Sequence, residues 1–259
     1  MVIINSIKSI MGYFKNHRWI FFVLLISLAI NLAKCKPAIL LWDSADYILM
    51  GKYLFSFGKS GYWVACRGIT WPLMLGVFWK LGLDPFQAGR VLELCLSTSS
   101  LFLLYMAGEE VFSKKSAALA SFFLAFSSLF FTWGKTLYVH IPAAFFSLLS
   151  LVFFLKKKRF WAGLTACLAF LTRYDQGILF GVFFIISLCE AFQKKNWGDI
   201  RELSLGFFSL CVPFLLFNYF LYHNIFYPFT VGMGLFQEDW HGLNFEKMFY
   251  IKWLIRQEF

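Results

Sequence analysis

Long apolar runs alternate with short clusters of lysine and arginine along most of the chain, and this pattern restricts the possible folds more than any other feature. A helix needs about 20 mostly apolar residues to cross a bilayer. Runs close to that length occupy 18–34, 86–107, 116–132, 136–155, 160–173, 176–192 and 203–222. Only 15% of the residues are charged, whereas soluble domains carry about 25%. We therefore predict an all-α fold, a polytopic transmembrane helix bundle with about seven spans.

The basic clusters indicate how such a bundle is oriented. A net charge of +10 would suggest nucleic-acid binding in a soluble protein, but these cations lie between apolar runs and suggest membrane topology instead. They precede the first run and follow the second, fourth and sixth: Lys8, Lys15 and Arg18; Lys114 and Lys115; Lys156 to Arg159; Lys194 and Lys195. Positive residues in short loops favour the cytoplasmic side. We expect a multi-pass plasma-membrane protein with a cytoplasmic N-terminus, an outer tail over 223–259 and no nucleic-acid partner.

The segment 35–85 is too long for a simple turn and too apolar for an ordinary loop. Within it, "DSADYILMGKYLFSFG" and "WPLMLGVFWKLG" show near-helical spacing of apolar residues and end at glycine. We predict two amphipathic helices at the outer membrane surface, followed by about six further spans over 86–222 in a single membrane domain, 1–259. Cys35 and Cys66 both fall in this outer loop, so a disulfide between them is one alternative.

Several charged or ionisable residues lie at the ends of the expected spans, where charge is costly and needs a reason. On the expected topology all of them face the outside: Asp43, Asp46, Arg67, His140, Arg173 and Asp175. Residues from separate segments would then converge on one outward cavity. The sequence therefore predicts a polar site at the outer ends of the helices.

Each of these residues also has a structural interpretation. Asp43 suits the first turn of a surface helix, because acids favour helix N-termini. Asp46 fits a solvated helix face, and a single His140 at a span end is more often structural than catalytic. Arg173 has the length to reach lipid headgroups or to pair with Asp175.

The spans themselves contain few charges. Arg90 and Glu93 are i, i+3 neighbours in the second span, and we expect them to pair within the bundle. The sequence has no Walker loop, no HExxH and no CxxC metal pair. We assign no cofactor and no metal ligand, although a divalent metal stays open. Any reaction must then use a carboxylate base with basic residues that hold the substrate.

The order of several short motifs resembles the GT-C glycosyltransferases, in the branch of the protein O-mannosyltransferases and the aminoarabinose transferase of lipid A. That branch places an acid and then a tyrosine just after the first span, and here "WDSADY" follows it. Further similar segments are "RGITWPLMLGVF", "AGRVLELCLSTSSLFLLYMAG", "AGLTACLAFLTRY" and "FNYFLYHNIFYPFT". The resemblance covers roughly 18–230. The second family acid is Ser44 here, and His140 stands where many members have an acid.

The resemblance implies an inverting transfer of a sugar from a polyprenyl-phosphate carrier to a lipid, glycan or protein acceptor at the extracytoplasmic face. Asp43 would act as the general base, and Arg67 or Arg173 would hold the phosphate, with Asp46, His140 and Asp175 also lining the substrate site. Two other hypotheses stay open. One is a transporter or lipid flippase, whose membrane charges would line a pathway. The other is a truncated, non-catalytic remnant of the same family, since members are usually longer.

Overall fold

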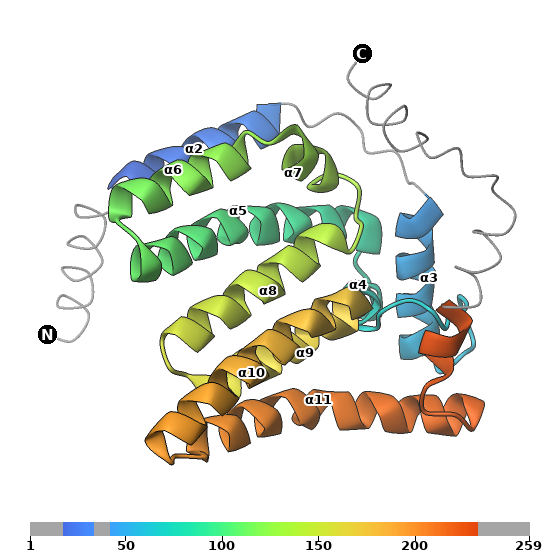
Figure 1. The fold of residues 1–259 in the computed structure, drawn as a ribbon. Coiled ribbons are helices and arrows are strands. Elements are labelled where there is room, and N and C mark those ends of the chain that lie inside the picture. Colours follow the sequence, from blue (N-terminus) through green and yellow to red (C-terminus); the bar gives the residue numbers. More distant parts are fainter. Residues whose placement is uncertain (1–17, 34–41, 233–259) are drawn as a thin grey trace, which may run out of the picture. The chain divides into compact units, whose positions relative to one another are not determined.

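The computed structural model describes residues 18–33 and 42–232, and every regular element in these ranges is a helix (Figure 1). The α-helices are α2 Arg18–Ala33, α3 Trp42–Ser56, α4 Thr70–Lys80, α5 Pro85–Val111, α6 Lys114–Ala125, α7 Ser128–Trp133, α8 His140–Leu155, α9 Arg159–Thr172, α10 Gly177–Lys194 and α11 Gly198–Tyr222. A short 3₁₀ turn, Tyr174–Gln176, joins α9 to α10. The predicted all-α class is confirmed. Cys35, and with it the disulfide alternative, lies outside the described residues.

The long apolar helices are those of an integral membrane protein. Within the described ranges, the stretches long and apolar enough to cross a bilayer are Pro85–Val111, Tyr174–Lys194 and Gly198–Tyr222. Shorter apolar helices cover Trp19–Ala29, His140–Leu155 and Arg159–Thr172. The number of spans stays a prediction.

The chain divides into two compact units. Of the described residues, the first unit contains 18–33, 42–64 and 68–212, and the second contains 65–67 and 213–232. In the second unit, α11 ends at Tyr222, and the next residue, His223, has a left-handed backbone with φ of 53°. The rings of Tyr222 and Tyr227 then stack with centroids 4.2 Å apart.

The centre of the first unit is formed by α5, α8 and α9, which pack in sequence order (Figure 1). Lys156 at the end of α8 pairs with Glu110 at the end of α5, so these two helices run in the same direction. Arg159 at the start of α9 pairs with Glu190 near the end of α10, so α9 and α10 are antiparallel. The runs 160–173 and 176–192 therefore form two separate helices.

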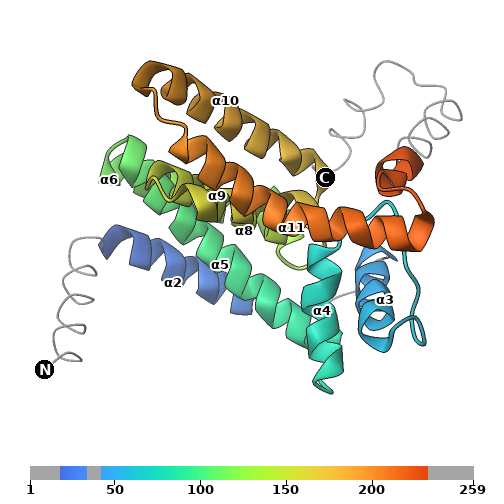
Figure 2. The same ribbon diagram turned by 90° about the horizontal axis from the view of Figure 1, so that it is seen from below.

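Glycines allow two pairs of helices to approach at backbone distance. A Cβ on Gly51 of α3 would lie 2.6 Å from the carbonyl oxygen of Pro72 in α4, where the two helices lie side by side (Figure 2). A Cβ on Gly163 of α9 would collide with the carbonyl oxygen of Leu203, and one on Gly206 of α11 with that of Phe160. Small residues drive such contacts in membranes, because lipid tails are as apolar as the side chains they would replace.

The run 116–132 does not form the single span that its hydropathy predicts. It is divided into α6 and α7, and the break falls at Phe126 and Ser127. The hydroxyl of Ser127 accepts a hydrogen bond from the backbone N–H of Phe130 and so begins a new helix. Ser113 caps the start of α6 in the same way through the N–H of Ser116. The cap at Ser127 thus divides a run that apolar content alone would keep intact.

Candidate active site

The first predicted acid, Asp43, lies in the first turn of α3. The next residue, Ser44, is fully buried, and its hydroxyl donates to the backbone oxygen of Thr136 in the connector between α7 and α8. This bond fixes the start of α3 against the segment that leads to His140. Asp43 and His140 consequently lie close enough to interact electrostatically.

Arg173, the predicted phosphate-binding cation, is held by a series of hydrogen bonds that begins at His140 and ends at Ser147, both on α8. The Arg173 NH1 group contacts the Nδ1 atom of His140 at 2.5 Å. Its Nε and NH2 groups donate to the two carboxylate oxygens of Asp175 at 3.2 and 2.7 Å. Gln176 donates to Asp175 at 3.4 Å and accepts from the hydroxyl of Ser147 on α8 at 2.9 Å. These contacts fix the orientation of the planar guanidinium of Arg173.

The structure therefore places Asp43, His140, Arg173 and Asp175 near one another, from three separate segments. An aromatic ring lies beside them, since the ring centroids of Trp133 and His140 are 4.1 Å apart. A guanidinium has five N–H donors. The contacts of Arg173 with His140 and Asp175 leave donors for a further ligand.

Two of the predicted residues take other positions. Asp46 accepts a hydrogen bond from the hydroxyl of Tyr62, in the loop between α3 and α4. Arg67 is half-buried and belongs to the second unit, so its role beside a phosphate stays a prediction.

Glu93 of α5 supports this region through a contact that the sequence does not indicate. Glu93 is fully buried, and its Oε2 atom accepts a hydrogen bond from the backbone N–H of Leu137 at 3.0 Å. The indole N–H of Trp71 in α4 donates to the carbonyl oxygen of the same Leu137 at 2.9 Å. Leu137 has a left-handed backbone with φ of 56°, which is uncommon outside glycine.

These contacts give Glu93 and Trp71 a positioning role. Leu137 lies directly after Thr136, which binds Ser44, and shortly before His140, so its turn sets the spacing between α3 and α8. Arg90, the expected partner of Glu93 in the same helix, also interacts with it electrostatically. The hydrogen bond to Leu137, a residue remote in the sequence, has no local signal that could have revealed it.

The opposite end of the first unit, which we call the basic end, collects cations from three loops. It contains Lys114, Lys156, Lys157, Arg159 and Lys194, paired with Glu109, Glu110, Glu190 and Asp199. The helix α8 has His140 at one end and Lys156 at the other, so the candidate site and the basic end lie at opposite ends of the helices. The basic clusters that follow the second, fourth and sixth apolar runs meet at this end, whereas Lys8 and Lys15 of the first cluster lie outside the described residues.

Solved structures show the same fold at low sequence identity. The Archaeoglobus fulgidus oligosaccharyltransferase tethered to an acceptor peptide with the NVT sequon is 16% identical, with a TM-score of 0.60 over 79% of this chain and 31% of its own. The A. fulgidus oligosaccharyltransferase AglB, in complex with an inhibitory peptide and a dolichol-phosphate, is also 16% identical, with a TM-score of 0.58 over 92% and 35%. The chain spans about a third of the length of these proteins.

The sequence itself carries a family signal. Among curated proteins, none matches the chain significantly. Residues 67–217 match the model of the dolichyl-phosphate-mannose-protein mannosyltransferases. This match includes α4 to α10 and the turn with Arg173 and Asp175. Because it covers more than half of the chain, the protein belongs to the dolichyl-phosphate-mannose-protein mannosyltransferase family, within the GT-C superfamily of membrane glycosyltransferases.

Proposed function

We propose that this chain transfers a sugar from a polyprenyl-phosphate donor to an acceptor hydroxyl at the extracytoplasmic face of the membrane. The observation that carries the proposal is the meeting of Asp43, His140, Arg173 and Asp175 at the end of the bundle opposite the basic end. The family match supports the reaction class. A solved structure with the same fold contains a dolichol-phosphate, which supports a lipid phosphate as the leaving group.

Asp43 would act as the general base. The acceptor oxygen attacks the anomeric carbon, and its proton passes to the Asp43 carboxylate. The bond between that carbon and the phosphate oxygen breaks, and its electron pair leaves with the polyprenyl phosphate. Direct displacement inverts the configuration at the sugar carbon. A base placed in this way contributes about 10²–10⁴ in rate.

Arg173 would stabilise the leaving phosphate, where negative charge develops in the transition state. Planar guanidinium groups bind phosphate with bidentate, charge-assisted hydrogen bonds. The paired contact with Asp175 orients the fork before the donor arrives. His140 contacts this cation and interacts electrostatically with the proposed base, so it is suited to contact the sugar or its phosphate.

The alternatives of a transporter or flippase gain little from the described residues. A pathway through the membrane needs polar groups near the middle of the spans. The buried carboxylate of Glu93 instead binds the backbone of Leu137. We therefore retain the transferase as the proposed function.

A matched pair of variants in α3 tests the proposal. Asp43→Asn keeps the shape of the side chain and removes the proton acceptor, so we expect transfer to fall by about 10²–10⁴ while protein levels hold. Asp46→Asn is the control, since Asp46 pairs with Tyr62 and we expect a small loss. The assay follows a radiolabelled polyprenyl-phosphate sugar in membranes that contain the full chain. Normal transfer by Asp43→Asn would exclude this residue as the base.

A further inference from the structure

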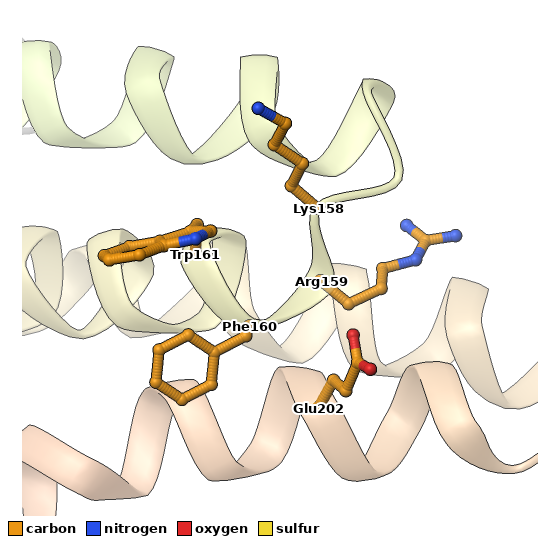
Figure 3. Close-up of a pocket in the computed structure, with 5 residues that line it drawn as sticks. All are labelled: Lys158, Arg159, Phe160, Trp161 and Glu202. Atoms are coloured by element: carbon orange, nitrogen blue, oxygen red, sulfur yellow. The ribbon is translucent and has the colours of Figure 1, made fainter.

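The basic end carries a pocket that the proposed reaction does not use. Lys158, Arg159, Phe160, Trp161 and Glu202 line a space of about 500 Å³ between the start of α9 and the start of α11 (Figure 3). The candidate active site lies at the other end of α9, where Arg173 follows Thr172. The pocket is thus separate from the reacting groups.

One of the two cations of this pocket is already neutralised. Arg159 is only 1% exposed, and its guanidinium donates to Glu190 and to Asp199, each at 3.0 Å. It also lies over the ring of Phe154, at 4.0 Å from the centroid. Arg159 therefore serves the packing of the helix ends, and it is not the group that a ligand in the pocket would meet first.

Unlike Arg159, Lys158 and Glu202 are exposed. Within the part of the chain that the structure describes, neither forms an ion pair, although both line the same pocket. Figure 3 shows Lys158 above and Glu202 below the first turn of α9, with Phe160 and Trp161 beside them. The pocket thus offers one positive and one negative group, apart from each other, next to an aromatic wall.

The location limits what can occupy this space. Lys158 belongs to the loop between α8 and α9, and both helices are apolar. A loop that joins two such helices lies at the boundary between lipid and water. Trp161 is 51% exposed and Phe160 37% exposed, and aromatic side chains gather at this level of the membrane. The molecules that reach the pocket at highest concentration are therefore lipid headgroups.

We propose that this pocket binds the headgroup of an aminophospholipid, a phosphodiester that carries a primary ammonium, as in phosphatidylethanolamine. Lys158 donates to the phosphate, and Glu202 accepts from the ammonium. The acyl chains of the lipid pack against the side chains of Phe160 and Trp161. The site goes beyond the proposed transfer, because neither group takes part in it.

Other common headgroups meet only part of this pattern. Phosphatidylglycerol satisfies Lys158 but offers no cation to Glu202. Phosphatidylcholine carries both charges, but its quaternary ammonium has no N–H to donate. Comparison of the affinities for the three lipids therefore distinguishes the contribution of Lys158 from that of Glu202.

Native mass spectrometry of the purified full chain in detergent tests the site, with the three lipids carrying identical acyl chains. We expect phosphatidylethanolamine to bind about tenfold more tightly than the other two, as one charge-assisted hydrogen bond allows. Lys158→Gln should weaken binding of all three. Glu202→Gln should remove the preference for phosphatidylethanolamine and leave phosphatidylglycerol unchanged or tighter. Lys115→Gln, which removes another exposed lysine in the first turn of α6, should change nothing.

Two results would overturn the proposal. If phosphatidylglycerol binds as tightly as phosphatidylethanolamine and Glu202→Gln has no effect, the basic end attracts anionic lipids without a built site. If Lys158→Gln behaves like Lys115→Gln, the pocket holds no headgroup. Both Lys158 and Glu202 are exposed, so the variants should fold, and an unchanged melting temperature verifies this. Neither outcome affects the transfer assay with Asp43→Asn.

Discussion

The charged side chains at the two ends of the first unit differ in their number of partners and in their exposure. At the basic end, Glu190 alone contacts three cations, Lys157, Arg159 and Lys194. Arg159 is 1% exposed there and also binds Asp199. At the candidate active site, the side chains of Arg173 and Asp175 are 34% and 52% exposed.

This difference in exposure distinguishes structural charges, which are buried and stabilise the fold, from available charges, which a ligand can reach. A guanidinium that is only 1% exposed cannot be reached by a ligand, and the fold depends on its two carboxylate partners. A guanidinium that is 34% exposed, with one carboxylate and one imidazole as partners, still presents donors to the outside. Of the two arginines, Arg173 is therefore the one whose guanidinium a ligand can reach.

The largest expected effect concerns the sides of the membrane on which the two ends lie. Lys157→Cys marks the basic end, and Lys59→Cys marks the exposed loop after α3. Because lysine-rich short loops stay cytoplasmic, we expect an impermeant thiol reagent added outside cells to label position 59 and spare position 157. Both variants need a background without the other accessible cysteines. External labelling at 157 would reverse the topology and move the proposed reaction to the cytoplasmic face.

The next effect concerns stability. The double substitution Glu190→Gln with Asp199→Asn leaves the buried Arg159 without a carboxylate, and we expect the free energy of unfolding to fall by about 3–5 kcal/mol. Asp175→Asn removes a partially exposed partner of Arg173 and should cost only about 0–1 kcal/mol. Unfolding in mixed detergent micelles measures both. Equal losses would contradict the distinction between structural and available charges.

The smallest effect concerns donor affinity. Arg173→Lys keeps the positive charge but replaces a planar fork by a point charge. We expect binding of a polyprenyl-phosphate sugar to weaken by about 1.5–3 kcal/mol, the range of a hydrogen bond to a charged group. Titration of the purified chain in nanodiscs gives this value, and the melting temperature should hold. Unchanged affinity would transfer the proposed role to Arg67.

The positions of the long helices could be read from the sequence because a bilayer imposes one simple requirement on them. The runs 86–107 and 176–192 became the helices Pro85–Val111 and Gly177–Lys194. Their ends were also marked by chemistry, since the Asp84 carboxylate caps α5 and Pro85 begins it. Periodicity and turn residues likewise located α3 and α4.

The remaining features depend on contacts between segments far apart in the sequence. The break at Ser127 is a capping event, and a serine in an apolar run does not reveal it. The bond from Leu137 to Glu93 connects α5 with the connector before α8. For the candidate site, the sequence could name Asp43, His140, Arg173 and Asp175, which the structure brings near one another. It could not show that Asp46 pairs with Tyr62 while Arg173 reaches His140.

The shortness of the central helices has a consequence for the lipid around them. With 16 residues in α8 and 14 in α9, these helices are about 24 and 21 Å long, against a hydrocarbon core of about 30 Å. Such hydrophobic mismatch is relieved when the bilayer thins locally or polar flanking groups sink below the headgroups. If α8 and α9 span the bilayer, we expect the headgroup layer to bend inward beside His140, which begins α8, and Arg173, which follows α9. A phosphate attached to a membrane-embedded carrier can reach that depth without its hydrocarbon chain leaving the leaflet.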